Sequence, residues 1–151
     1  MQPFSTIEEI LDFAMQAEQE AVDFYRNLAQ IQTNSQISAV FTEFAKEEVK
    51  HKARLKKIKE EKAYSFENEQ VSDLKLSDYL VAIPATAHMD YQEALILAMK
   101  KEKAAYKLYM ALAQRTTDPG LIRAFHALAQ EESKHKLRFE VEYDEYVMRE
   151  N

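Results

Sequence analysis

The sequence predicts an all-α protein, an antiparallel four-helix bundle made of two duplicated helical hairpins joined by a long crossover. Its 151 residues include one Gly and three Pro, with 30% charged and 46% hydrophobic residues, a composition typical of long amphipathic helices. Residues 6–62 also align with residues 90–146 without a gap, and 20 of the 57 pairs are identical. We therefore expect a single domain over residues 1–151, with these two repeats as hairpins and residues 63–89 as the crossover.

The first helix is predicted to begin at a capping box. Thr6 and Glu9 have the spacing at which two side chains bond each other's backbone N–H groups, and Ser5 with Glu8 is an alternative one residue earlier. From there one stripe keeps the alternating four and three spacing of a helix face that packs against its neighbours. Its members are Ile7, Leu11, Ala14, Glu18, Ala21, Tyr25 and Leu28. A carboxylate, Glu18, therefore falls inside an otherwise buried stripe.

The second helix follows a short polar break at residues 32–35, where Asn34 is a good N-cap, and it is predicted to run to about Lys62. A connection this short predicts an antiparallel hairpin. The packing stripe of this helix contains Ile37, Phe41, Phe44, Glu48, His51, Leu55 and Ile58. Here two polar side chains, one helical turn apart, occupy positions that packing would fill with apolar ones.

The crossover, residues 63–89, shows no sustained period and includes Pro84, which makes a continuous helix unfavourable. The third helix begins after Asp90, which forms a capping box with Glu93. Its stripe contains Tyr91, Leu95, Ala98, Glu102, Ala105, Tyr109 and Leu112. The fourth helix begins at Asp118 and Pro119 and continues close to the C-terminus. Its stripe contains Leu121, Phe125, Leu128, Glu132, His135 and Phe139.

Six polar residues thus stand in the packing stripes, near the middles of the four helices. They are Glu18, Glu48, His51, Glu102, Glu132 and His135. Four carboxylates in one apolar interior cannot all remain ionised alone, since each desolvated charge costs several kcal/mol. Two divalent metal ions would balance four carboxylates and leave one imidazole for each ion. Carboxylate and imidazole ligands suit iron or manganese, and zinc is a weaker fit without thiolates.

Two assignments within this cluster have alternatives. Glu47 and Glu131 directly precede Glu48 and Glu132, and their spacing from the following His also permits pairing on a helix, although the stripe register favours Glu48 and Glu132. Tyr25, with its counterpart in the other repeat, Tyr109, fits equally well as a core residue and as a hydrogen-bond donor to a metal ligand.

Composition excludes several classes of function. A net charge of −6 argues against a nucleic-acid surface, because phosphate binding needs a basic face. The absence of Cys excludes disulfides, thiolate metal sites and cysteine catalysis. We find no signal peptide and no apolar stretch long enough to span a bilayer, so the sequence predicts a soluble, cytoplasmic protein without a membrane partner.

The stripe residues resemble the rubrerythrin family of the ferritin-like superfamily. The match covers residues 14–29, 44–51, 98–113 and 128–135, and its pattern is a Glu, a Tyr seven residues later and then Glu-x-x-His, repeated once. The resemblance implies a ferritin-like bundle with a di-iron centre that reduces hydrogen peroxide or reacts with dioxygen. It implies that the six polar stripe residues are the iron ligands, with Glu48 and Glu132 at or near bridging positions, and that the protein is a homodimer or larger assembly.

Two differences from the family pattern bear on mechanism. Rubrerythrins have a rubredoxin-like iron site with four Cys, which this chain lacks, so electrons would come from an external donor, a rubredoxin-like protein or a flavoprotein. The family also has an additional Glu three residues after the third-helix Glu, at the position of Ala105. The family's peroxidase mechanism therefore does not carry over intact.

The same ligand set is compatible with other functions. We expect a peroxide-reducing di-iron oxidoreductase first, and a ferroxidase or iron-storage protein of ferritin type second. A helical protein with a structural di-metal site is a third interpretation, and a manganese catalase-like activity would follow from a different metal.

Overall fold

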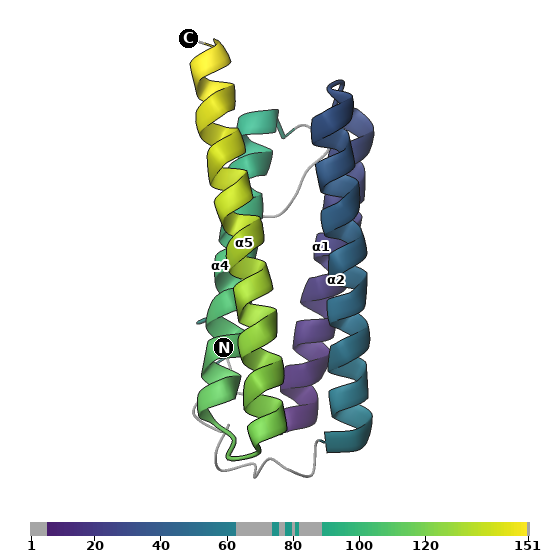
Figure 1. The fold of residues 1–151 in the computed structure, drawn as a ribbon, viewed down its shortest axis with the longest axis vertical. Coiled ribbons are helices and arrows are strands. Elements are labelled where there is room, and N and C mark those ends of the chain that lie inside the picture. The colour runs from purple at the N-terminus through teal and green to yellow at the C-terminus, as the bar shows by residue number, and fades with distance from the viewer. Residues whose placement is uncertain (1–5, 63–73, 76–77, 80, 82–88, 151) are drawn as a thin grey trace. The chain divides into compact units, whose positions relative to one another are not determined.

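The computed structural model describes residues 6–62, 74–75, 78–79, 81 and 89–150. Four long helices account for most of these residues (Figure 1): α1 (Ile7–Ile31), α2 (Ser35–Lys62), α4 (Tyr91–Gln114) and α5 (Pro119–Glu150). The chain divides into two compact units, Met1–Lys75 and Leu76–Asn151. Helix α1 packs against α2 in the first unit, and α4 packs against α5 in the second. Each predicted repeat is therefore a helical hairpin.

The two hairpins begin with the N-caps that the sequence predicts. The Thr6 hydroxyl accepts a hydrogen bond from the backbone N–H of Glu9 at 3.2 Å. The Asp90 carboxylate accepts one from the backbone N–H of Glu93 at 2.7 Å. Each bond satisfies an N–H group that has no partner within its own helix. The alternative box that starts at Ser5 lies outside the described residues.

The second helix of each hairpin is also capped as predicted. Asn34 Oδ1 accepts from the N–H groups of Gln36 and Ile37, at 3.0 and 3.2 Å. At the equivalent position Asp118 Oδ1 accepts from Gly120 and Leu121, at 2.8 and 3.1 Å. These caps fix the residues at which α2 and α5 begin, directly after the short connections within the hairpins. The starting residue then determines which face of the helix each later residue occupies.

The stripe of α1 is buried along its whole length, as predicted. Its seven members, with Ile10, Val22 and Phe24 beside them, are all inaccessible or nearly so. In α2 the prediction is right except at one position: Phe44 is only half-buried, and Ala45 lies fully inside. A small residue therefore occupies the inner position next to Glu48, while the large Phe44 ring lies at the margin, where its edge contacts Tyr25 with ring centroids 6.5 Å apart.

The second hairpin repeats this burial pattern, except that two positions are less buried than predicted. All the predicted stripe members of α5 are buried, whereas Tyr91 and Ala105 of α4 are half-buried. Most of the predicted crossover, including Pro84, lies outside the described residues. The prediction that both hairpins form a single domain stays a prediction.

Candidate metal centre

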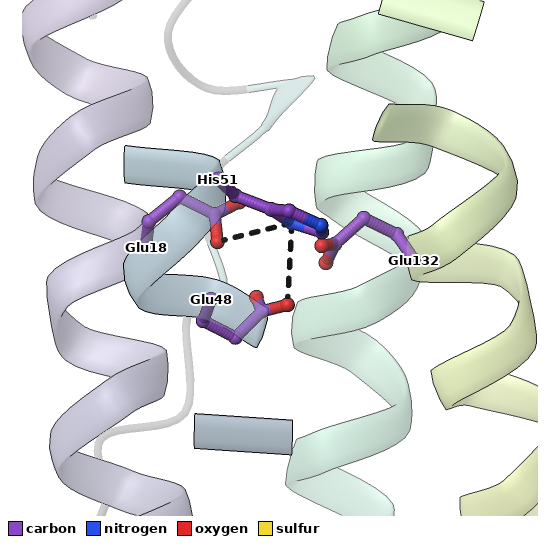
Figure 2. A group of neighbouring side chains, drawn as sticks. All are labelled: Glu18, Glu48, His51 and Glu132. Atoms are coloured by element: carbon purple, nitrogen blue, oxygen red, sulfur yellow. Dashed lines mark ion pairs between the residues drawn. The ribbon is translucent and has the colours of Figure 1, made fainter. Parts of the chain in front are cut away.

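In the first hairpin, three polar side chains converge between α1 and α2. Glu18 comes from α1, and Glu48 and His51 come from α2 (Figure 2). His51 Nδ1 lies 3.3 Å from Glu48 Oε1 and 3.7 Å from Glu18 Oε2. These three residues, which we call the first triad, offer ligand atoms that all lie within 4.8 Å of one another. One small volume thus receives two carboxylates and one imidazole.

The local sequence explains how α1 and α2 can bring these groups together. Glu48 and His51 stand three residues apart, so both side chains leave the same face of α2 about one turn from each other. On α1, Ala14 and Ala21 lie one turn to either side of Glu18, and both are buried. Their small side chains leave space for a carboxylate in a region that Leu or Phe would fill.

The first triad is removed from solvent. Relative exposure is 2% for Glu18, 1% for Glu48 and 1% for His51. The individual atoms that face each other, Glu18 Oε2, Glu48 Oε1 and His51 Nδ1, are themselves buried. Carboxylates are almost never found this deep unless they are paired or coordinate a cation.

The second hairpin contains an equivalent group, the second triad, formed by Glu102 of α4 with Glu132 and His135 of α5. His135 Nδ1 lies 3.7 Å from Glu102 Oε2, the same distance as between His51 and Glu18. The ligand atoms of this triad also lie within 4.8 Å of one another, and all three residues are buried. The duplicated sequence has therefore produced a duplicated geometry.

The neighbouring glutamates of each pair differ in burial. Glu48 and Glu132 are buried, whereas Glu47 and Glu131 are each only half-buried. The stripe register had favoured the first pair, and the structure places that pair inside with the histidines.

The donor atoms of each triad fit a divalent cation. Two carboxylates carry two negative charges, and an imidazole nitrogen is a neutral ligand of intermediate softness, a combination that suits iron or manganese, with zinc a weaker fit. Removing such charges from water costs several kcal/mol per ion, which a metal ion at the same point would offset. Both triads are therefore candidate metal sites, each with ligands from two helices.

The two predicted tyrosines are core residues in the structure. Tyr25 is fully buried next to Phe24 and Phe44, and Tyr109 is buried with its ring stacked on Phe125 at 6.4 Å. Each stands seven residues, or two helical turns, after the carboxylate of its own helix, so its bulk lies at one end of the triad. Their predicted hydrogen bond to a metal ligand stays a prediction.

One buried carboxylate was missed by the sequence reasoning. Glu142 of α5 is almost fully buried, and its Oε1 accepts hydrogen bonds from the Tyr91 hydroxyl at 3.0 Å and from Arg149 Nη2 at 3.2 Å. The signal was present, because 142 is the stripe position that follows Phe139. The Arg149 guanidinium also lies over the ring of Tyr146, 5.8 Å from its centroid, so the network closes the end of the second hairpin.

In the part of the chain that the structure describes, no helix contains a stretch long and apolar enough to cross a membrane.

Comparison with known proteins identifies relatives of the chain. A family model described as Rubrerythrin matches residues 9–143, which include both triads. A solved structure from Thermotoga maritima, described as that of a ferritin-like diiron-carboxylate protein, superposes with a TM-score of 0.79. It is 20% identical in sequence, and the match covers 97% of this chain and 99% of that one. A search of curated proteins found no match. The likeness confirms the predicted fold class, a ferritin-like bundle of four helices.

Proposed function

Because the chain belongs to the rubrerythrin family, we propose that it is a non-haem di-iron oxidoreductase that reduces hydrogen peroxide with electrons from an external donor. The observation that carries the proposal is the duplicated triad of two buried carboxylates and one buried imidazole. We propose that the first and second triads together bind two iron ions. Four carboxylates then balance two divalent ions, and each ion receives one histidine nitrogen.

The metal pair would supply the two electrons that convert one hydrogen peroxide and two protons into two waters. The residues of this chain have a different task, which is to hold the donor atoms at one point and to keep bulk water away. His51 Nδ1 lies toward the oxygens of both Glu18 and Glu48, so the three donor atoms of the first triad face one point. His135 is directed in the same way toward Glu102.

The surrounding core keeps these donors dry. The small side chains of buried Ala14 and Ala21 leave space for the Glu18 carboxylate, and buried Tyr25 lies two turns further along the same helix. Ala105 stands where the family has a further Glu, so the proposed chemistry uses no carboxylate at that position. We therefore propose a centre with the same ligand set on both metals.

The electron donor of the proposed reaction lies outside the chain. With no Cys in the sequence, the chain has no rubredoxin-like iron site of its own, and we propose a rubredoxin-like protein or a flavoprotein as the source of electrons. Dioxygen is the alternative oxidant. We further propose that the protein functions in the cytoplasm as a homodimer or larger assembly.

The proposal is tested by anaerobic loading of the full chain with ferrous iron, followed by titration with hydrogen peroxide and measurement of absorbance. We expect about two irons per chain, oxidised by about one peroxide. Iron that binds but never changes oxidation state would favour the structural di-metal interpretation. Uptake of many irons per chain by a large assembly would favour ferroxidase or storage activity.

A matched pair of variants assigns the ligands. Glu48→Gln keeps the side-chain volume but removes a charged ligand, and we expect iron affinity to fall by at least about tenfold. Glu47→Gln makes the same change at the half-buried neighbour and should leave iron affinity within about twofold of wild type. Equal losses from the two variants would show that the ligand register has been misassigned.

A further inference from the structure

The exposed side of α2 carries a row of cations that the metal site does not use. Lys46, Lys50, Arg54 and Lys57 follow one another at spacings of four, four and three residues, so they share one face of the helix, and all four are exposed. We call these four residues the basic face of α2. It is an unusual feature of a chain whose net charge is −6.

The basic face lies on the outer side of the helical turns that carry the first triad. Lys50 directly precedes His51, and Lys46 stands two residues before Glu48, but both ligands are on the buried side of α2. A helix with its side chains is about 10–12 Å across. A molecule bound to the basic face would therefore be separated from the first triad by the thickness of this one helix.

The basic face places like charges one helical turn apart. Lys46 with Lys50, and Lys50 with Arg54, are like charges at i,i+4 positions, an arrangement that destabilises a helix. Glu43 and Glu47, three residues before Lys46 and Lys50, and Glu61, four residues after Lys57, offset part of this repulsion. The four cations nevertheless form a continuous row on the exposed side of the helix.

The second hairpin shows that the triad does not require this pattern. Lys50 and Arg54 have identical counterparts in α5, Lys134 and Arg138, but the residue equivalent to Lys57 is Val141. The residue equivalent to Lys56 is likewise changed, to Glu140. The same buried triad thus lies beneath a strongly basic face in one hairpin and beneath a mixed face in the other.

Two exposed apolar residues lie beside the cations. Val49 is 44% exposed, and Ala53 is exposed between Lys50 and Lys57. An apolar centre with a charged rim is the usual composition of a protein–protein contact surface. Charges at such a rim mainly increase the rate of encounter and select the partner by charge.

We propose that the basic face of α2 is the docking site for an acidic electron-transfer protein that reduces the metal centre. The proposal rests on the proposed function, which requires two electrons from outside the chain for each peroxide. The face is positively charged, so the complementary partner is acidic, and the site lies one helix thickness from the first triad. A one-electron partner would bind, transfer its electron to the metal centre and leave, and this cycle would occur twice for each peroxide. The two electrons, together with two protons, convert one hydrogen peroxide into two waters.

The test measures binding of oxidised rubredoxin with a net negative charge to the purified full chain, by isothermal titration calorimetry. We expect affinity to fall steeply between about 10 mM and about 100 mM salt, over which the Debye length shrinks from about 30 Å to about 10 Å. At low salt Lys50→Glu/Arg54→Glu should weaken binding by about tenfold or more. A lack of binding, or binding independent of salt, would overturn the proposal.

The second hairpin provides the matched control. Lys134→Glu/Arg138→Glu makes the same charge change at the equivalent positions of α5, and it should alter the affinity by less than about twofold. Equal weakening by both double variants would indicate attraction to net charge alone and would contradict a defined site. Tighter binding of a DNA duplex that displaces rubredoxin from the same face would also overturn the proposal.

A second variant guards against misfolding of the charge-reversed protein. Lys46→Gln/Lys57→Val introduces the residues found at the equivalent positions of α5, Gln130 and Val141, which a helix of this type accommodates. It should weaken rubredoxin binding by about threefold to tenfold while the circular dichroism spectrum stays that of wild type. Unchanged affinity in this variant would contradict the docking site even if the first variant failed to fold.

Docking and peroxide chemistry can fail separately. Wild-type protein loaded with iron and reduced by dithionite tests peroxide reduction without any protein partner. If this protein ignores peroxide while rubredoxin still binds through α2, the proposed function is wrong but the docking surface remains. If peroxide is consumed and rubredoxin does not bind, only the docking proposal is wrong.

Discussion

The two hairpins of this protein share their interior and differ at one end and on one face. Both have a buried triad in which a histidine Nδ1 lies 3.7 Å from the carboxylate of the preceding helix. The positions that close the hairpins differ. In the first hairpin these positions are the buried residues Ile7 and Ile58. The equivalent residues of the second hairpin, Tyr91 and Glu142, are joined by a hydrogen bond. Duplication has therefore kept the donor atoms, while the ends and outer faces have diverged.

This difference shows which constraints act on each part of the fold. The proposed ligand atoms must stay at one point, and the Glu and His residues and the alanines beside Glu18 recur 84 residues later. An end of a hairpin needs only to be dry or fully hydrogen-bonded, and apolar packing and a polar network both meet that requirement.

The largest expected effect tests whether the two interiors are equivalent. Leu11 and Leu95 occupy equivalent positions and are fully buried, so Leu11→Ala and Leu95→Ala should each lower the free energy of unfolding by about 2–5 kcal/mol. The measurement is urea denaturation of the full chain followed by circular dichroism. If the chain is the single domain that the sequence predicts, each variant shifts one common transition. Two separate transitions, with each variant affecting only one, would contradict that prediction.

An intermediate effect is expected at the ends that differ. Tyr91→Phe removes a donor to the buried Glu142 and should cost about 1–3 kcal/mol of stability. The double variant Tyr91→Ile/Glu142→Ile introduces the residues of the first hairpin and should cost less than about 1 kcal/mol, because no buried carboxylate is left behind. Thermal denaturation of both variants makes the comparison. A double variant less stable than Tyr91→Phe would show that the second hairpin needs its polar network for another reason.

The smallest expected effect concerns the N-caps, where the hairpins should respond alike. Asn34→Ala and Asp118→Ala each remove a side-chain acceptor for two backbone N–H groups and should each cost about 1 kcal/mol. The exchanges Asn34→Asp and Asp118→Asn keep an acceptor and serve as controls, with expected changes of a few tenths of a kcal/mol. A cap whose removal has no effect in urea denaturation would mean that packing alone fixes that helix start.

Most of the fold could be predicted because helical periodicity and capping are local properties of the sequence. The four N-caps and nearly all buried stripe positions are as predicted, including the choice of Glu48 and Glu132 over their neighbours. The predicted burial of Phe44 was wrong because Ala45 is also on the inner side of α2, and spacing cannot decide which of two adjacent residues lies deeper. The partner that explains buried Glu142 is Tyr91, 51 residues earlier in the chain, a distance at which no local pattern gives a signal.

The candidate site was likewise predictable only in part. The residue types and the convergence of each triad follow from helical register, since the Glu and His of α2, and those of α5, stand one turn apart on their helix. The identity of a metal ion and of a redox partner is not encoded in local sequence patterns, so both remain proposals. Roles of Tyr25 and Tyr109 depend on where their hydroxyl groups point, which periodicity does not encode.

The short connections within the hairpins have a consequence for how quickly the protein folds. Because α1 packs on α2 and α4 on α5, many contacts join residues that are close in sequence, and helical proteins of this kind typically fold in microseconds to milliseconds. Synthesis of the chain by a ribosome, at about 5–20 residues per second, is far slower. The first hairpin can therefore form while the second is still being made, which brings Glu18, Glu48 and His51 together before α5 is complete.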